Sequence, residues 1–352
     1  MINNSRLVEN AFNMLKFLYD ELGNRRFETI DISICKDLDD LYALIISLWC
    51  MSLAKEGLYK EYVTVEGEEL TSPKGQVNLS ESITRQTILN GKLVCDYDEL
   101  SDDIYINQVL KGTLLFLAND NSLSESIVKI AKKALQSFNG VRYTEINNIR
   151  WKNVVFNNNN SRYKHLIEIC QSYYGEKDIE NKIGLDDGTR VYILFKKQLL
   201  KYLKETYSEE QNVVIPFEQP YTLEDEPPFE IRLNKQQKMV AVENGDRAVL
   251  YLIRLQDDLA KNDSKMQRKR MYELLRYVRE YESFRRVKTT GVIVYTNIDR
   301  RRINMNPMSI NSVDNHMLGE VIVDLFDQWR YIVTKLNEPY KAFIERYNKR
   351  KR

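Results

Sequence analysis

The sequence predicts an α/β protein of two domains, an α+β N-terminal domain followed by a domain built on a mixed β-sheet. Three patterns support this class. Helical apolar spacing dominates the first half of the chain, short β-type runs separated by turn residues lie within 229–255, and a long helical segment then leads to the apolar run 291–295. With 352 residues, 43% of them hydrophobic, the chain is long and apolar enough to bury two cores.

The N-terminal domain is expected to span residues 1–180 and to be mostly helical. Apolar residues recur at helical spacing from Leu7 to Leu18 and again from Leu41 to Trp49, the second time after acidic residues that favour a helix N-terminus. Two short strands interrupt the helices and make a small α/β insertion. Further helices are expected at 104–117, 124–138 and 163–174, and the strands at 62–65 and 75–79.

The second domain is expected to span residues 190–352. A polar, glycine-containing stretch at 177–189 separates it from the first domain. Its final apolar run, 291–295, is typical of a strand that is buried on both faces of a sheet. A helix, a hairpin, a helix and a strand in this order indicate an α/β core with a mixed sheet. The expected elements are a helix at 191–207, a β-hairpin, a strand at 247–255, a helix at 264–284 and a strand at 291–295.

Charge, cysteines and hydropathy exclude several classes of protein. The formal net charge of +1 excludes a globally basic nucleic-acid binder, so any DNA contact must use local basic surface, such as the cluster 265–270. The four cysteines are widely spaced, without the pairing of a zinc site or a redox motif. The N-terminus lacks the apolar segment of a secretion signal, and the longest apolar stretch, 41–54, is too short to span a bilayer. We therefore expect a soluble, cytoplasmic protein without a membrane partner.

The stretch 227–245 carries the strongest signal of chemistry, because its pattern predicts a β-hairpin. Residues 229–233 and 238–243 have the pattern of strands, and the polar residues 234–237 between them are typical of a turn. The register of a hairpin decides which side chains share a face, and therefore which of its polar residues can act together.

In the expected register, Glu230 lies opposite Ala241. Strand alternation then places Glu243 diagonally from Glu230 on the same face, with Cβ atoms about 7 Å apart. Two carboxylates at that distance suit a shared divalent cation such as Mg²⁺. The next position on this face is Gly245, where an acid-x-lysine motif would present its lysine. The predicted metal site of Glu230 and Glu243 is therefore incomplete, and the alternative is two solvent-facing glutamates on an exposed hairpin.

No neighbouring residue fully replaces the missing lysine. Strand alternation points Lys238 to the opposite face. Arg232 shares the face of the two glutamates and can steady phosphate charge, but an arginine stays protonated and cannot act as a base. Moving the motif to the strand 247–255 places Leu252 and Arg254 at the acid and lysine positions, which removes the acid as well. Either register leaves the motif incomplete.

Several blocks along the chain point to one family. The most specific is the acidic block 96–103, DYDELSDD, which runs into NQVLKGTL at 107–114. Other blocks are 10–15, 73–78, 161–164 and 271–277, the last of them leading to GVIVY at 291–295. Together they resemble the McrC family, the nuclease subunit of McrBC restriction systems, which act on modified cytosine in DNA. The resemblance covers most of the chain.

The resemblance implies a division of labour between the domains. The N-terminal domain would dock on a hexameric ring of the AAA+ partner McrB and stimulate its GTP hydrolysis, and the C-terminal domain would belong to the PD-(D/E)XK nuclease class. In that class, an acid on one strand and an acid-x-lysine on the next bind Mg²⁺ and orient the attacking water. The resemblance assigns the acid positions to Glu230 and Glu243. It also implies a supporting pair one helical turn apart, Glu273 and Tyr277, whose alternative is a surface helix face.

The expected partners follow from the same resemblance. The chain has no glycine-rich phosphate loop ending in Gly-Lys-Ser or Gly-Lys-Thr, so GTP is expected on the AAA+ partner and not on this chain. Double-stranded DNA is the expected substrate. Two functions stay open: an endonuclease subunit that cleaves methylcytosine-containing foreign DNA, and a catalytically inactive subunit that stimulates the GTPase and binds DNA without cutting it. A DNA-binding regulator without a ring partner is a third, weaker alternative.

Three features of the rest of the chain have competing interpretations. Lys74 and Arg85 either reach the nucleotide pocket of the partner or are ordinary surface residues. The acidic block 96–103 lacks the spacing of a calcium loop, so we expect it to cap the following helix and to face a basic partner surface. His165 and His316 are isolated in the sequence, and we expect both to be structural or surface residues.

Overall fold

The computed structural model divides the chain into two compact units. Unit 1 comprises Met1–Leu38 and Glu176–Arg352, and unit 2 comprises Asp39–Gly175, so that unit 2 is inserted into unit 1. The boundary after Gly175 lies near the expected one at about residue 180, but the first 38 residues, which were expected in the N-terminal domain, group with the C-terminal part of the chain. The structure describes residues 5–19, 22, 30–183, 187, 190, 191, 194, 195, 212–214, 239–244, 247–255, 264–297, 308–313, 316–325, 327, 331, 332, 334 and 335.

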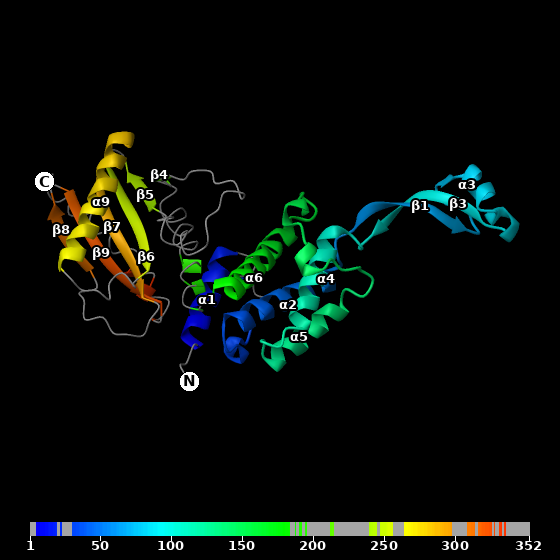
Figure 1. The fold of residues 1–352 in the computed structure, drawn as a ribbon, viewed down its shortest axis with the longest axis horizontal. Coiled ribbons are helices and arrows are strands. Elements are labelled where there is room, and N and C mark those ends of the chain that lie inside the picture. The colour runs from blue at the N-terminus through cyan, green and yellow to red at the C-terminus, as the bar shows by residue number, and fades with distance from the viewer. Residues whose placement is uncertain are drawn as a thin grey trace. The chain divides into compact units, whose positions relative to one another are not determined.

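Unit 2 has a helical core (Figure 1). Its four long helices are α2 (Leu38–Glu56), α4 (Tyr105–Ala118), α5 (Glu125–Gln136) and α6 (Lys164–Ile183), which extends past the end of the unit. The apolar stripes that predicted these helices are buried, as at Ile45 and Leu114. The carboxylate of Asp40 joins two helices, because it accepts a hydrogen bond of 2.8 Å from the N–H of Ser124 at the start of α5. Short 3-10 helices, η4 (Ile146–Asn148), η5 (Trp151–Asn153) and η6 (Ser161–Tyr163), precede α6.

A β-ribbon emerges between α2 and α4, and we call residues 61–101 the arm. It contains β1 (Glu61–Leu70), β2 (Gln76–Val77) and β3 (Leu93–Ser101) in the antiparallel order β1-β3-β2, with α3 (Leu79–Thr84) and η3 (Thr87–Asn90) at its far end (Figure 1). The two strands predicted here are confirmed, whereas β3 was not predicted. Its second half carries the acidic block, and such residues are uncommon in strands unless the strand is solvated.

Unit 1 is built on a six-stranded mixed sheet. The strand order is β4-β5-β6-β7-β9-β8, in which β6, β7 and β9 run parallel and the other pairs are antiparallel. This order confirms the predicted α/β class with a mixed sheet. The strands are β4 (Asn212–Val214), β5 (Met239–Asn244), β6 (Arg247–Leu255), β7 (Lys288–Asn297), β8 (Met308–Val313) and β9 (His316–Asp324).

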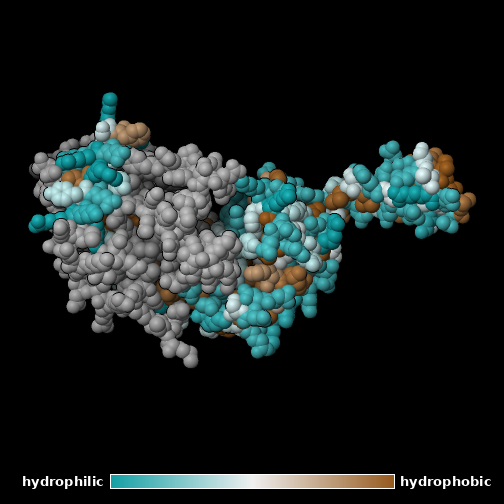
Figure 2. Space-filling model, viewed as in Figure 1, coloured by the Kyte–Doolittle hydropathy of each residue, from teal (hydrophilic) through white to brown (hydrophobic). Residues whose placement is uncertain are grey.

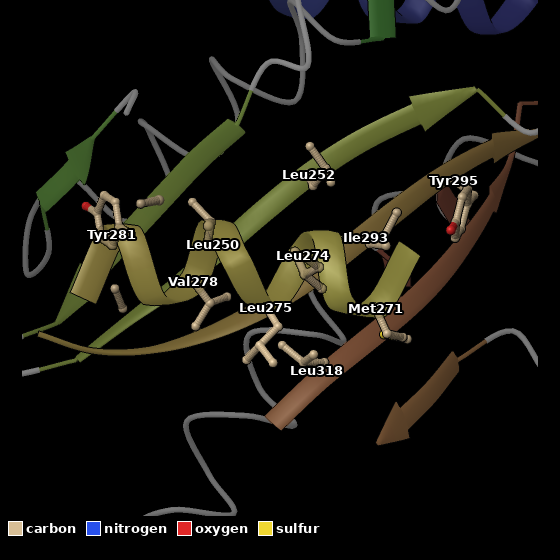
Figure 3. Close-up of a cluster of buried hydrophobic side chains, with 12 residues drawn as sticks. Leu250, Leu252, Met271, Leu274, Leu275, Val278, Tyr281, Ile293, Tyr295 and Leu318 are labelled. Carbon is tan, nitrogen blue, oxygen red and sulfur yellow. The ribbon is translucent and has the colours of Figure 1, made fainter. Parts of the chain in front are cut away.

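Helix α9 (Ser264–Arg285) joins the parallel strands β6 and β7 and covers one face of the sheet. Its core-facing residues, among them Leu274 and Val278, pack on Leu250 and Ile293 (Figure 3). Gly291 allows this close approach, because a Cβ built at this position would lie 2.8 Å from the Cγ of Leu274. The predicted helix and both predicted strands around it are therefore confirmed.

The N-terminal helix α1 (Ser5–Leu18) also belongs to unit 1, followed by η2 (Ile32–Ile34). Asn10 is buried on α1, and its side-chain amide donates to the carbonyl oxygen of Leu325, just after β9, and to that of Asp327 at 3.0 Å. The N-terminal helix is thereby joined to the residues that follow β9. Within the described ranges, none of the helices combines the length and the apolar character that a membrane crossing requires.

Candidate functional site

The pairing of β5 corrects the predicted hairpin. Ala241 pairs with Val214 of β4 on one side and with Leu250 of β6 on the other. Both edges of β5 are therefore filled at this point. The expected register, with Glu230 opposite Ala241, is wrong, because β4 and β6 occupy the positions that it needs.

Position 243 has no acidic neighbour among the strand positions that pair with it. Glu243 pairs with Asn212 of β4 and with Ala248 of β6. Ala241 and Ala248 both belong to the core under α9, so alternation and pairing place position 243 on the face of the sheet that α9 covers. Glu230, Arg232 and Gly245 lie outside the described residues, so the carboxylate pair stays a prediction.

The alternative register places the acid-x-lysine motif on β6. This strand leads through α9 to the parallel strand β7. At the acid position, Leu252 is fully buried and packs in the core cluster with Leu250 and Ile293 (Figure 3). An aliphatic side chain offers no ligand to a cation. The described part of β6 therefore supplies no carboxylate, as its sequence indicates.

Magnesium requires several oxygen ligands in near-octahedral geometry. Among the residues that the structure describes, no three His, Cys, Asp or Glu side chains gather closely enough to hold a metal ion. The positions around residue 243 are apolar or neutral. Glu230 lies outside the described residues, so the expected Mg²⁺ site of Glu230 and Glu243 stays a prediction.

The predicted supporting pair lies on α9. Glu273 and Tyr277 are both half-buried and one helical turn apart. Tyr277 packs against the core cluster, and the guanidinium carbon of Arg276 lies 5.0 Å from the centroid of its ring. The pair therefore borders the core instead of forming a fully exposed helix face, and its supporting role stays a prediction.

Three polar side chains are buried between α9 and the sheet, and the sequence analysis did not predict them. Arg270, Glu320 and Tyr295 are at most 5% exposed. The hydroxyl of Tyr295 donates to the carboxylate of Glu320 at 3.3 Å, and the guanidinium carbon of Arg270 lies 5.8 Å from the Tyr295 ring centroid. The sequence places Arg270 in the basic cluster 265–270, which is expected at the surface, but Arg270 lies one turn before the buried Leu274. That spacing was the available signal for its burial.

His316 is structural, as expected. Its Nε2 lies 2.8 Å from a carboxylate oxygen of Glu282, near the end of α9. The other oxygen of Glu282 accepts a hydrogen bond of 2.6 Å from the N–H of Thr289, at the start of β7. The pair therefore joins the end of the crossover helix to the first residues of two strands.

The acidic block of the arm holds the ribbon together. The carboxylate of Asp96 accepts from the N–H of Gly67 at 2.7 Å, and that of Asp98 accepts from the Thr64 hydroxyl at 2.8 Å. Asp103 accepts from the side chain of Gln108 at 2.9 Å and binds Arg142. The expected helix cap is wrong in its detail, because the residue that caps α4 is Ile104, which makes no side-chain cap bond.

Both basic residues singled out on the arm are bound within it. The ammonium of Lys74 lies 3.7 Å from the ring centroid of Tyr97 and 3.6 Å from the carboxylate of Glu99. Arg85 binds the carboxylate of Glu81 and donates to the carbonyl of Gly67 at 3.1 Å. These contacts favour the surface interpretation of Lys74 and Arg85 over a free cation that reaches a nucleotide.

The far end of the arm exposes a cluster of large apolar side chains, which we call the apolar tip. It lies on α3 and η3, and Figure 2 shows apolar side chains at this end of the arm. Its members are Leu79 (59% exposed), Ile83 (66%), Ile88 (44%) and Leu89 (81%). The ribbon that carries it is acidic, since residues 61–101 contain eight acids and three bases, a net charge of −5. Exposed apolar patches of this kind mark sites of interaction with other molecules.

Known proteins resemble this chain in sequence and in fold. A curated relative, the type IV methyl-directed restriction enzyme EcoKMcrBC of Escherichia coli (strain K12), is 21% identical over 164 residues, which make up 47% of this chain and 47% of the relative. The match thus spans about half the length of that relative.

A similar fold occurs in the refined half-complex from a tetradecameric assembly of Thermococcus gammatolerans McrB AAA+ hexamers with bound McrC. The alignment covers 96% of this chain and 76% of the matched chain, at 14% identity and a TM-score of 0.58. A chain of the Thermococcus gammatolerans McrBC complex aligns over 56% of this chain and 57% of its own length, with 16% identity and a TM-score of only 0.39.

A family model gives the broadest sequence match. The family described as McrBC 5-methylcytosine restriction system component matches residues 3–296, which is most of the chain. This range includes the acidic block of the arm, the helices of unit 2, α9 and nearly all of β7. The resemblance inferred from the motifs is confirmed, and the chain belongs to the McrBC 5-methylcytosine restriction system component family.

Proposed function

We propose that this chain is the McrC-like subunit of a GTP-dependent restriction complex that acts on modified, methylcytosine-containing foreign DNA. In this proposal, unit 2 docks on an AAA+ GTPase hexamer of the McrB kind and stimulates its GTP hydrolysis. GTP is bound by that partner. The observation that carries the proposal is the apolar tip, which the arm presents to solvent on an acidic ribbon.

The arm has the properties of a docking element. Apolar side chains at its far end would gain free energy by leaving water, at about 25 cal/mol per Å² of apolar surface removed. The acidic ribbon behind the tip would favour a partner surface lined by lysine and arginine. Bonds inside the ribbon, such as those of Asp96 and Asp98, hold its shape before a partner binds, which lowers the entropy cost of docking.

In the same proposal, the chain engages double-stranded DNA without cutting it. The acid-x-lysine motif is incomplete in both registers, and Leu252 is buried where one register needs an acid. Cleavage assisted by Mg²⁺ at Glu230 and Glu243, with Arg232, Glu273 and Tyr277 in support, is the alternative. The resemblance to a nuclease subunit supports that alternative.

The proposed docking is tested by GTP turnover of the cognate AAA+ GTPase with and without this chain. Wild-type chain should raise the turnover, and Ile83→Asp with Leu89→Asp at the apolar tip should abolish the increase, because a buried unpaired charge is costly. Val155→Asp is the matched control, since Val155 is 73% exposed in unit 2 outside the arm. Equal loss in the tip variant and the control would contradict a role of the tip.

Cleavage is tested in the same mixture with methylated duplex DNA and Mg²⁺. Intact DNA together with raised GTP turnover supports the non-cutting subunit. If the DNA is cut and Glu243→Ala or Glu230→Ala abolishes the cutting, the endonuclease alternative is correct. The cognate GTPase alone serves as the control for contaminating nuclease.

A further inference from the structure

Helix α9 carries opposite kinds of residues on its two sides. The side that packs on the sheet is apolar, with Leu274, Leu275 and Val278 fully or almost fully buried. The opposite side is exposed, and we call it the outer face of α9. A helix turns by 100° per residue, so its five members lie within an arc of about 100°. They are Arg268, Lys269, Tyr272, Arg276 and Arg279, all exposed.

The outer face of α9 concentrates positive charge in a chain that is otherwise almost neutral. Among the α9 residues whose exposure the structure describes, Glu280 is the single exposed acid. The whole helix contains seven basic and three acidic residues, a net charge of +4, whereas the whole chain carries +1. The arm, with −5, has the opposite sign. Charge is therefore separated between two surfaces, each of which suits a different kind of partner.

Within the described part of the chain, carboxylates hold some of the exposed cations and leave others unpaired. In unit 2, five exposed or half-exposed cations each lie within 4 Å of a carboxylate: Lys74, Arg85, Lys129, Arg142 and Arg162. Arg268, Lys269 and Arg276 have no such ion pair in the described structure; Arg276 contacts only the ring of Tyr277. Like charges that lie side by side repel each other, and a polyanion would relieve this repulsion.

The spacing of these cations suits a nucleic-acid backbone. From residue 268 to residue 279 the helix rises about 16 Å. A duplex of that length presents about nine phosphate charges on its two strands, because one charge occurs about every 1.7 Å of its axis. Three arginines add planar donors that match phosphate oxygens. Tyr272, at 60% exposure among them, adds a hydroxyl that can bind a phosphate or a sugar.

We infer that the outer face of α9 is a surface that binds the phosphate backbone of double-stranded DNA. Contacts to phosphate position the duplex and carry no sequence information, so this face would hold DNA of any sequence. The inference rests on the DNA-engaging part of the proposed function and gives that part a location. It does not depend on the apolar tip, on GTP or on cleavage.

The test is the salt dependence of duplex binding by the full chain. A short fluorescent duplex of mixed sequence is titrated at several KCl concentrations with wild-type chain and with the triple variant Arg268→Gln, Lys269→Gln and Arg276→Gln. The triple variant should bind more weakly. The slope of log affinity against log salt should fall by about 2.7, since each phosphate contact contributes about 0.9.

Two further variants, one triple and one double, separate a role of this surface from a general effect of positive charge. Lys129→Gln, Lys132→Gln and Lys133→Gln remove three exposed cations from α5, and this control should keep the wild-type slope. Arg268→Lys with Arg276→Lys keeps the charge of α9 and should keep most of the slope, which also reports that the helix is intact. Equal losses in the α5 and α9 triple variants would overturn the inference.

Other results assign the face to another partner. If the α9 triple variant binds DNA normally but no longer raises GTP turnover, the face binds the ring partner and the inference is wrong. Preference for duplex RNA over duplex DNA at equal salt would overturn the assignment to DNA.

If wild-type chain raises GTP turnover but does not bind DNA, the inference fails while the docking role stands. If it binds DNA with the expected slope but never raises GTP turnover, the docking role fails and the inference stands.

Discussion

Gly291 of β7 lies directly under Leu274 of α9, with no room for a methyl group between them. A Cβ at position 291 would meet the Cγ of Leu274 and a methyl carbon of Val278, each at 2.8 Å. The crossover helix can therefore approach the central strand of the sheet only because this residue is glycine.

Gly291→Ala should destabilise unit 1 by about 1–3 kcal/mol, because an extra methyl group forces the packed side chains away from their preferred positions. The free energy of unfolding from urea denaturation measures the change. Gly175→Ala is the control: this glycine lies in α6 with nothing near its Cβ position, so the variant should be neutral or stabilising by up to about 1 kcal/mol. Unchanged stability of Gly291→Ala would mean that α9 packs less closely than described.

Tyr295→Phe should cost about 1–3 kcal/mol of unfolding free energy, although it removes only one oxygen atom. Its hydroxyl donates to the buried carboxylate of Glu320, which would lose a donor that water cannot replace. Tyr272→Phe, on the exposed side of α9, should change the stability by less than about 0.5 kcal/mol. The same urea experiment compares both variants, and equal stabilities would argue against the bond to Glu320.

Gly75→Ala should disrupt the arm more than Gly91→Ala does. Both glycines have a φ of 67°, so the backbone strain from an added Cβ is the same. At Gly75, however, that Cβ would lie 2.4 Å from the carbonyl oxygen of Asp96, whereas nothing lies within 4 Å of it at Gly91. Hydrogen exchange of β3 amides measures the effect. Equal protection of these amides in the two variants would contradict the close contact between the turn and β3.

The phenol of Tyr97 should ionise at a higher pH than the phenol of an ordinary tyrosine. The hydrogen bond that its phenol donates to Glu68 raises its pKa to about 12. Because the folded pKa lies above the unfolded value of about 10, this contribution to stability is complete below pH about 10 and is lost as the pH rises through about 12. Ultraviolet difference titration of wild type against Tyr97→Phe isolates the phenol. In Glu68→Gln the transition should move down toward the ordinary value, and an unmoved transition would remove Glu68 as the cause.

Periodicity was sufficient for the elements that bury one continuous face. The repeats of Met271, Leu274, Leu275 and Val278 predicted α9, and the apolar run at 291–295 predicted β7, because burial dictates residue type at each of those positions. The pairing of β5 was mispredicted for the opposite reason. The polar residues 234–237 resemble a local turn, but β4, more than twenty residues earlier, takes that edge of β5. Pairing between distant segments leaves no local pattern in the sequence.

The candidate sites were predictable only in part. Motif blocks located the acidic segment of the arm, but not that Asp96 and Asp98 bind Gly67 and Thr64 across the ribbon. The apolar tip was not foreseen, because Leu79, Ile83 and Leu89 have the residue types of a core and only the fold leaves them exposed. Buried Arg270 was misplaced for the related reason that charge alone suggests a surface.

The bond between Asn10 and the Leu325 carbonyl joins residues that are 315 positions apart, and all of unit 2 lies between them. During translation, α1 leaves the ribosome first. It must then wait on the order of tens of seconds for its partner, at the usual 5–20 residues per second. Unit 2, whose residues are consecutive, is fully synthesised within that interval. The N-terminal helix therefore cannot make this bond until unit 2 and β9 have been synthesised, and its apolar side lacks its final partner for that interval.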